Sequence, residues 1–322
     1  MSIRTKRRVL AAAIESEAGT AETLSASDGG LLVSELSWDL NIEMVARDYM
    51  KDDLGKIKPV PGKRHGTFSF TTEIRGKNAA FSVSNYPEVG KYLRACGFSQ
   101  TVDATEDAET VTYAPTSDQT SMATLTVGIY NDGRRILLSG CRGNVQMECN
   151  NGEYGKFMFS FSGVIESVAD AAQLTVDLSG EVGLNPPLLL GTSFTMNDGD
   201  SYSAKISSMS VDMGNTVTMR EDMGASHGYA YPEITDRNPT GKIDPELALE
   251  SEYPFLANWL NGVSAAIAFS AGTVQYNKYA ISIPTATTTS VGDSERESLA
   301  VADMGFELNL TTGDDEISIV FS

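Results

Sequence analysis

The stretch LSWDLNIEMVARDYM, residues 36–50, recurs in altered form as MSVDMGNTVTMREDM, residues 209–223. Each copy starts with apolar residues that alternate with serine and aspartate, and each ends on an arginine, an acid and a methionine in the same spacing. Alternation of period two is typical of a strand with one buried face. We therefore interpret the recurrence as the first strand and hairpin base of a duplicated domain, and not as a catalytic motif.

Further segments recur in the same order. NYPEVGKYLRA, residues 85–95, matches EYPFLANWLNG, residues 252–262, and predicts a short helix in each half because proline suits the first turn of a helix. KFMFSFSG, from residue 156, resembles GFELNLTTG, from residue 305, and both alternate as strands do. A further short helix is expected from Arg8 to Glu17. The predicted organisation is an N-terminal arm over residues 1–20, a first β domain over 21–175 and a second, duplicated β domain over 176–322.

Composition excludes several classes of function. The formal net charge of −19 argues against a protein that wraps nucleic acid, which takes lysine and arginine. The three cysteines show no CxxC spacing, so reduced thiols are expected instead of disulfides or a zinc site. No segment approaches the roughly 20 apolar residues of a membrane helix, and we expect a soluble protein made in the cytoplasm, without membrane contact.

Motifs for catalysis or ligand binding are not found in the sequence. His65 and His227 lie in loop-like stretches, and GxSxG, HExxH and Walker A patterns are absent. The acidic run Asp314–Glu316 is interpreted as a solvated turn. We expect no enzyme activity, no metal and no cofactor. A ligand-binding β-sandwich module is the competing class, but it needs an exposed aromatic platform, and Trp38 and Trp259 are expected at core positions.

Longer segments resemble one protein family. In the second half these are PPLLLGTSFTMNDG (residues 186–199), MSVDMGNTVTMREDM, and GYAYPEITDRNPTGKIDPEL (residues 228–247). In the first half they are LAAAIESEAGT (residues 10–20) and YLRACGFSQT (residues 92–101). Together they resemble the long form of the bacteriophage tail tube protein, or major tail protein, with a duplicated tube domain.

The resemblance implies a mainly β fold with short helices, made of two tandem β-sandwich or half-barrel tail-tube domains that each carry a flanking helix. Such domains join edge to edge into rings, and a doubled domain implies homotrimeric, pseudo-hexameric rings that stack into a hollow tube. An acidic lumen would repel phosphates and conduct genomic DNA into the host without specific binding. The implied location is the virion tail, assembled in the host bacterial cytoplasm, with tape measure, tail-tip and terminator proteins as partners. A tail-tip, baseplate or tail-completion ring protein with the same domain is the alternative, and a capsid decoration protein is a further one.

The resemblance also gives the repeated stretch a role. In the family, a loop of this kind reaches the neighbouring ring, so charged groups after each first strand are expected at inter-subunit or inter-ring contacts. An arginine–carboxylate pair inside one domain is the other reading of the same residues. The basic arm is either a solvated tail or a docking segment for an acidic neighbour, such as another copy of the chain. The candidate contact residues are Arg4, Arg7, Arg8, Arg47, Asp48, Met50, Arg220, Glu221 and Met223.

Overall fold

Strands account for most of this protein, and the expected mainly β fold with short helices is confirmed. The computed structural model describes residues 3–105, 108–176 and 178–322. The strands of the first half are β1 (Arg8–Ile14), β2 (Ser34–Val45), β3 (Val60–Glu73), β4 (Phe98–Asp103), β5 (Thr110–Pro115), β6 (Leu125–Asn131), β7 (Arg134–Asn150) and β8 (Lys156–Asp170). Those of the second half are β9 (Ser193–Asn197), β10 (Ser201–Tyr202), β11 (Ser208–Asp212), β12 (Asn215–Glu221), β13 (Tyr229–Arg237), β14 (Thr240–Ile243), β15 (Ser264–Ala271), β16 (Tyr279–Arg296), β17 (Leu299–Leu308) and β18 (Ser318–Phe321). The helices are η1, a 3₁₀ turn (Ala26–Gly29), α1 (Gly90–Ala95), α2 (Ser179–Val182) and α3 (Phe255–Asn261).

Strand order repeats between the two halves. In the first half, hydrogen-bonded neighbours follow the order β2, β3, β8, β7, β6, β1. In the second half they follow β11, β14, β17, β16, β15, β9, and every pairing in both series is antiparallel. The quoted stretches occupy equivalent places, because one forms β2 and the other forms β11 and β12. The two halves thus share one strand order, while the duplication of a domain stays a prediction from the sequence.

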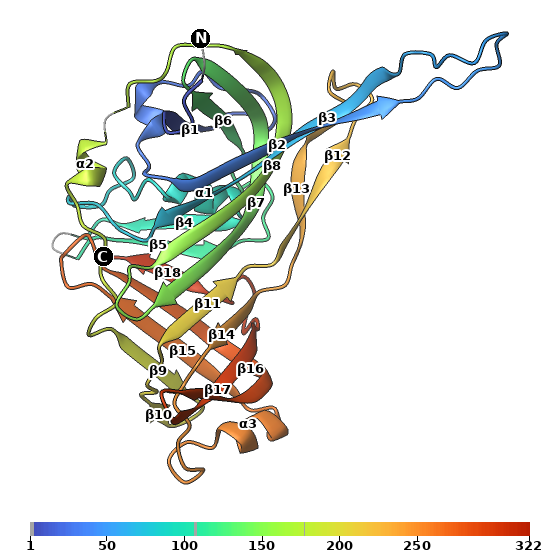
Figure 1. Ribbon diagram of the computed structural model, residues 1–322. Coiled ribbons are helices and arrows are strands. Elements are labelled where there is room, and N and C mark those ends of the chain that lie inside the picture. Colours follow the sequence, from blue (N-terminus) through green and yellow to red (C-terminus); the bar gives the residue numbers. More distant parts are fainter. Residues whose placement is uncertain (1–2, 106–107, 177) are drawn as a thin grey trace.

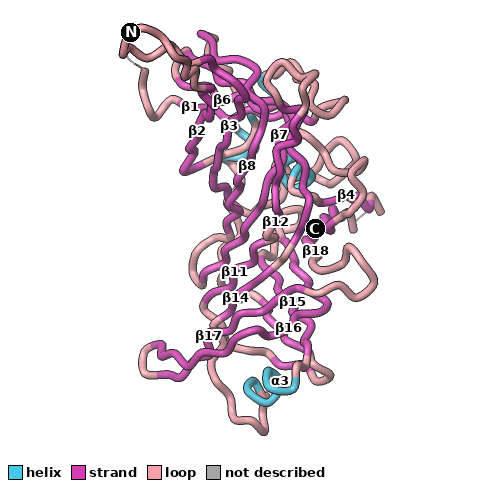
Figure 2. The backbone as a smooth tube through the Cα atoms, turned by 90° about the vertical axis from the view of Figure 1, so that its right-hand side faces the viewer, coloured by secondary structure: helices cyan, strands magenta, loops and turns pink. Residues whose placement is uncertain are grey.

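The halves share one sheet instead of being separated by a linker. β11 pairs with the end of β7, so that Met209 lies opposite Cys149 and Val211 opposite Met147. At the other side of the molecule β18 pairs with β5. Figures 1 and 2 show the strands of the two halves following one another along the length of the molecule. A single buried cluster runs through both halves.

Aromatic side chains fill the core of the first half. The ring centroids of Phe68 and Phe161 lie 5.1 Å apart, as do those of Phe70 and Phe159, in stacked pairs across β3 and β8. Tyr92 of α1 packs edge-on against Phe70, with the two ring centroids 5.0 Å apart. Burial of each such side chain contributes about 1.5–3 kcal/mol relative to leaving it in water. α1 is therefore fixed against the sheet by its aromatic residue.

Three local expectations are wrong. The expected helix at the N-terminus is strand β1, because Leu10 pairs opposite Ile129 and the flanking alanines are buried in the sheet, where tertiary packing outweighs their helix propensity. Trp259 on α3 is 37% exposed and is not a core residue, although Trp38 does pack against the core. His65 lies within β3, not in a loop, and its ring packs edge-on against Tyr229 at 5.8 Å.

Two long hairpins leave the body of the molecule in the same direction (Figure 1). The first is formed by β2 and β3 with residues 46–59 as its tip, and the second by β12 and β13. They touch each other near the base of the first, where the Arg64 backbone amide donates to the carbonyl of His227 at 3.1 Å. The tip of the first hairpin extends well beyond the second (Figure 1).

Candidate functional surfaces

One face of the shared sheet is lined mainly by polar side chains, with Met158 among them. Because side chains alternate, the strands that bury phenylalanine on one side present hydroxyls, amides and charges on the other. A shallow groove over this face is lined by Gln146, Asp212, Lys242 and Glu307, from both halves of the chain. The polar face also includes Ser37, Asp39, Thr67, Ser69, Asn144, Glu148, Lys156, Ser160, Ser162, Ser208, Ser210 and Thr240.

Carboxylates give this polar face its electrostatic character. Asp212 accepts hydrogen bonds from the side-chain amides of Asn144 at 2.7 Å and Gln146 at 2.6 Å, which hold it on the sheet surface. The ammonium group of Lys156 is neutralised by Glu153 at 2.8 Å. A surface of serine, threonine and carboxylates offers phosphates few positive partners, so it is poorly suited to binding a polyanion.

The tip of the first hairpin carries the predicted contact residues Arg47, Asp48 and Met50. All three are exposed, and Met50 and the nearby Leu54 are each exposed at 105% of the reference value. Among the residues that the structure describes, Arg47 and Asp48 make no side-chain hydrogen bond or ion pair. Apolar side chains held this far from the body are unusual on a protein that works alone, and they indicate a surface that a partner covers.

The second hairpin carries Arg220, Glu221 and Met223, and here the arginine has a partner in its own domain. Arg220 Nη1 donates to Glu233 at 2.9 Å, and this hydrogen bond raises the pKa of the guanidinium. Glu221 accepts from Lys63 of the first hairpin at 2.6 Å. Met223 is fully exposed. Arg220 thus forms an ion pair within its own hairpin, whereas Arg47 has no ion-pair partner within the described chain.

The three arginines of the basic arm are anchored to the first half. Arg7 forms an ion pair with Asp132 at 2.7 Å, and the Arg4 backbone amide donates to the same carboxylate at 3.0 Å. Arg8 lies over the ring of Trp38, with its guanidinium carbon 4.7 Å from the ring centroid, and donates to the carbonyl of Leu36 at 3.2 Å. Described residues 3–8 are thus bound to the body at several points.

A family model for the phage tail tube protein matches residues 5–312 of the chain. The chain belongs to the phage tail tube protein family. Membership gives it a structural role in the tail tube of a phage virion, where copies of a tube protein assemble with one another. No curated protein matches the chain.

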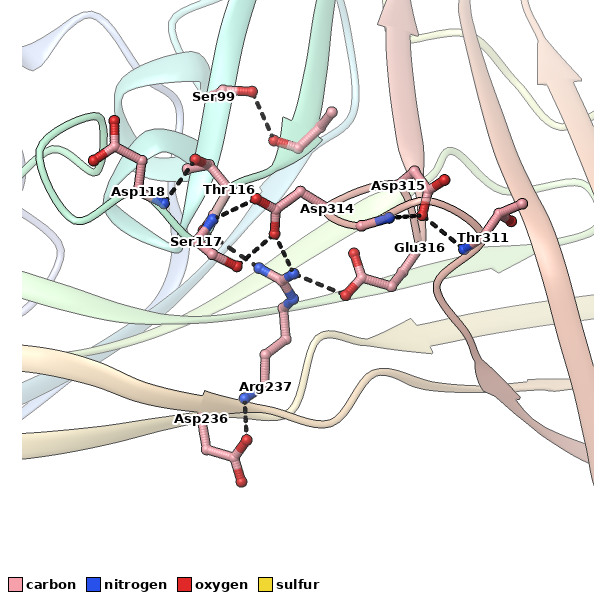
Figure 3. A network of polar contacts seen from close by, with 12 residues as sticks. Ser99, Thr116, Ser117, Asp118, Asp236, Arg237, Thr311, Asp314, Asp315 and Glu316 are labelled. Atoms are coloured by element: carbon pink, nitrogen blue, oxygen red, sulfur yellow. Dashed lines mark hydrogen bonds and ion pairs between the residues drawn. The ribbon is translucent and has the colours of Figure 1, made fainter.

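A polar junction in this tail tube family member ties the two halves together (Figure 3). Arg237, at the end of β13, donates from Nη2 to Asp314 at 3.0 Å and to Glu316 at 2.8 Å. Asp314 also accepts from the backbone amide and the hydroxyl of Ser117, at 2.8 and 2.5 Å, in the first half. Burial would raise the pKa of Asp314, but the hydrogen bonds from Ser117 and Arg237 outweigh it, and the pKa lies below its usual value.

Sequence reasoning missed this junction. The sequence predicts a solvated turn over the acidic run. This fits Asp315 but not Glu316, which is buried with 9% of its surface exposed. Asp315 accepts from the backbone amides of Thr311 and Thr312, and these bonds hold the pKa of its carboxyl near 2. The junction joins residues far apart in the chain, so no local pattern of the sequence points to it.

The remaining chemistry of this family member is sparse. His227 accepts from Arg64 Nε at 3.1 Å, and burial, followed by the neighbouring guanidinium, lowers the pKa of its imidazole. The thiols of Cys96, Cys141 and Cys149 are buried, and burial raises the pKa of each. Within the described ranges, no group of three or more histidine, cysteine or acidic side chains could hold a metal ion, and no helix is long and apolar enough to cross a membrane.

Proposed function

We propose that this protein forms the wall of a hollow tail tube whose rings contain three chains each. The observation that carries this proposal is the recurrence of one strand order in both halves of the chain. Two copies of a tube domain over residues 21–175 and 176–322 make each chain equivalent to two ring positions. Three chains then close a ring of pseudo-sixfold symmetry, which removes exposed sheet edges that would otherwise promote aggregation.

We propose that the polar face of the shared sheet lines the lumen. This face presents Asp39, Glu148, Asp212 and Glu307 beside hydroxyl groups. At physiological salt their field extends about 8 Å from the wall, which repels the phosphates of DNA near the wall and lets genomic DNA slide into the host. The net charge of −19 is consistent with such a lining.

We propose that the first hairpin reaches the neighbouring ring, with Arg47, Asp48 and Met50 at the contact. Its exposed apolar tip supports this role, since a stacked ring would remove Met50 from water. Charged groups beside the apolar contact would fix the register between rings more than they add affinity. Arg220, Glu221 and Met223 are proposed as secondary contacts, and tape measure, tail-tip and terminator proteins as partners at the lumen and ends of the tube. Assembly is proposed to take place in the host cytoplasm.

Electron microscopy of the purified protein tests the proposal. Long hollow tubes with three chains per ring are expected. Single rings without polymer would instead favour a tail-tip, baseplate or completion protein, and a monodisperse monomer at high concentration would contradict the assembly.

A heavy-metal cluster tests the lumen. It is attached through a maleimide to the variant Gln146→Cys, because Gln146 is exposed on the polar face and the native thiols are buried. End-on views are expected to show the label inside the wall. A label on the outer surface would refute the assignment of this face.

A further inference from the structure

Two strand segments of the chain have an unpaired edge: β2, which ends the first series, and the second part of β16. β2 is the last strand of the sheet and pairs only with β3. β16 pairs with β15 and β18 through its first part, but from Thr288 to Arg296 it pairs with β17 alone. Both statements refer to the described residues. Exposed edges of this length are templates for a further strand.

The chain already contains one joint of the kind that these edges could form. Inside the molecule, β11 begins the second copy and pairs with the end of β7 of the first copy. β2 is the equivalent of β11, and β16 is the equivalent of β7, by their places in the two strand orders. A joint between β16 of one chain and β2 of the next would therefore repeat the internal joint.

The equivalence can be carried to single residues. Across the first copy, Trp38 lies opposite Phe68, Phe68 opposite Phe161, and Phe161 opposite Gly143. The repeated stretch aligns Trp38 with Val211.

Across the second copy, Val211 lies opposite Gly241, Gly241 opposite Phe306, and Phe306 opposite Thr288. Thr288 thus takes the place of Gly143. A register shift follows in β16, after which Ser294 lies opposite Val301 and takes the place of Glu148.

We propose, on the basis of the ring assembly above, that β2 of one chain pairs antiparallel with residues 292–296 of β16 in a second copy, with Ser37 opposite Ser294. The internal joint sets this register, since Ser210 lies opposite Glu148 there. Ser37 and Ser294 are the equivalents of these two residues. The partner surface is thus assigned to one strand segment on each chain.

Charge complementarity supports this register. It places Trp38 and Leu36 of one chain opposite Asp293 and Glu295 of the other. These two carboxylates are exposed and have no partner among the described residues. Arg8 is held over Trp38 and on the Leu36 carbonyl, and its Nε is buried without a hydrogen-bond partner. In the proposed joint, the guanidinium of Arg8, which has no carboxylate partner in the described part of its own chain, would therefore lie close to Asp293 and Glu295 of the neighbouring chain.

The C-terminal part of β2 supports the proposed joint independently. Ile42 and Met44 are 51% and 53% exposed in the chain, although both are apolar. Their equivalents in the second copy, Asn215 and Val217, are partly covered by the first copy. Asn215 Nδ2 donates to the carbonyl of Cys96 at 2.8 Å. The second copy of a neighbouring chain would cover Ile42 and Met44 in the same way.

Disulfide trapping between two different variants tests the register. Chains with Ser37→Cys are mixed with chains with Ser294→Cys, assembled, oxidised and run on a non-reducing gel, so that only a joint between chains produces a dimer band. The matched control replaces Ser294→Cys with Ser290→Cys, an exposed serine on the same face of β16. It lies about 13 Å further along the strand, beyond the roughly 7 Å between Cα atoms that a disulfide spans.

A dimer band that is at least about tenfold stronger with Ser294→Cys than with Ser290→Cys is expected from this geometry. Equal bands, or no band with Ser294→Cys, would overturn the register. Both soluble oligomers and tubes are sampled, so an absence of tubes contradicts the proposed function, while an absent cross-link contradicts only this joint.

A charge reversal gives a second measurement. Arg8→Glu is expected to raise the concentration needed for assembly about fivefold, the equivalent of one exposed ion pair. Adding Asp293→Lys is expected to restore assembly. Failure of this rescue in a folded chain would contradict the pairing of the two groups.

Discussion

Replacement of Arg237 by methionine tests the energetics of the junction between the two halves. The variant keeps most of the side-chain volume but removes the guanidinium that binds Asp314 and Glu316. The side chain of Glu316 is only 12% exposed, and its Oε2 has no partner even in the native chain. Without Arg237, the Glu316 carboxylate would be buried with no ion-pair partner.

Removal of one partner from a buried ion pair typically costs about 3–5 kcal/mol. We expect the lower end, about 3 kcal/mol, because the Asp314 side chain is 38% exposed and keeps its bonds from Ser117. For a urea dependence of about 2–3 kcal/mol/M, this corresponds to a fall of roughly 1 M in the unfolding midpoint.

Urea unfolding of the dissociated chain measures this effect. Fluorescence of Trp38 reports on the first half and that of Trp259 on the second, so single-tryptophan variants show whether the halves still unfold together. Adding Glu316→Gln to Arg237→Met should recover at least half of the loss, because it removes the unpaired charge.

The matched control is Arg220→Met. Arg220 is paired with Glu233, but the two side chains are 54% and 32% exposed, so the variant should unfold close to the native chain. A loss of less than about 1 kcal/mol in Arg237→Met, or no recovery with Glu316→Gln, would refute the reasoning about this junction.

Three further predictions concern the hairpin tip, the N-terminal arm and pH. Met50→Ser combined with Leu54→Ser should leave the unfolding curve unchanged but shorten or abolish tubes in electron micrographs; the exposed Val83→Ser, away from the hairpin, is the control, and normal tubes from the double variant would exclude the tip from stacking. Deletion of residues 1–8 should reduce tube yield while thermal melting shows an intact fold, and an unchanged yield would remove any role for the arm. Burial would raise the pKa of Asp244, but hydrogen bonds from Ser207 and Ser208 outweigh it and lower the pKa, so its contribution to stability is full above about pH 4 and is lost as pH falls through the lowered value. Urea unfolding between pH 7 and 3 should therefore show a smaller pH dependence in Asp244→Asn than in the native chain, and equal slopes would contradict this assignment.

The sequence predicted the features that depend on local periodicity. The alternation around Phe68 and in residues 156–163 was sufficient to place strands with one buried face. It failed where partners far away in the chain decide the outcome. Ala11 favours a helix in isolation but lies in a strand, because β6 supplies its hydrogen bonds and covers it. Trp259 has the pattern of a core residue, yet it is exposed on α3, as are Leu256 and Leu260 of the same helix.

The repeat in the sequence was sufficient to name the candidate contact residues, but it could not predict which side chains surround each of them. Arg47 and Arg220 occupy the same place in the repeated stretch, and only the second has a carboxylate partner within the described chain. The difference arises from β13, because its Glu233 lies opposite Thr218 and within reach of Arg220 in the paired part of the second hairpin, whereas Arg47 lies in an unpaired tip. The polar face likewise depends on the pairing of seven strands from both halves, which no local pattern of the sequence predicts.

The internal pairing of β7 with β11 has a kinetic consequence for the proposed ring of three chains. The joint between the two halves is already closed when a single chain folds, at any protein concentration, because both strands belong to the same polypeptide. A ring then forms from three bodies instead of six, and the rate of its first steps should rise with a lower power of protein concentration. A tube built this way could begin to grow in a cell at a level of subunit where single-domain subunits would still be dispersed.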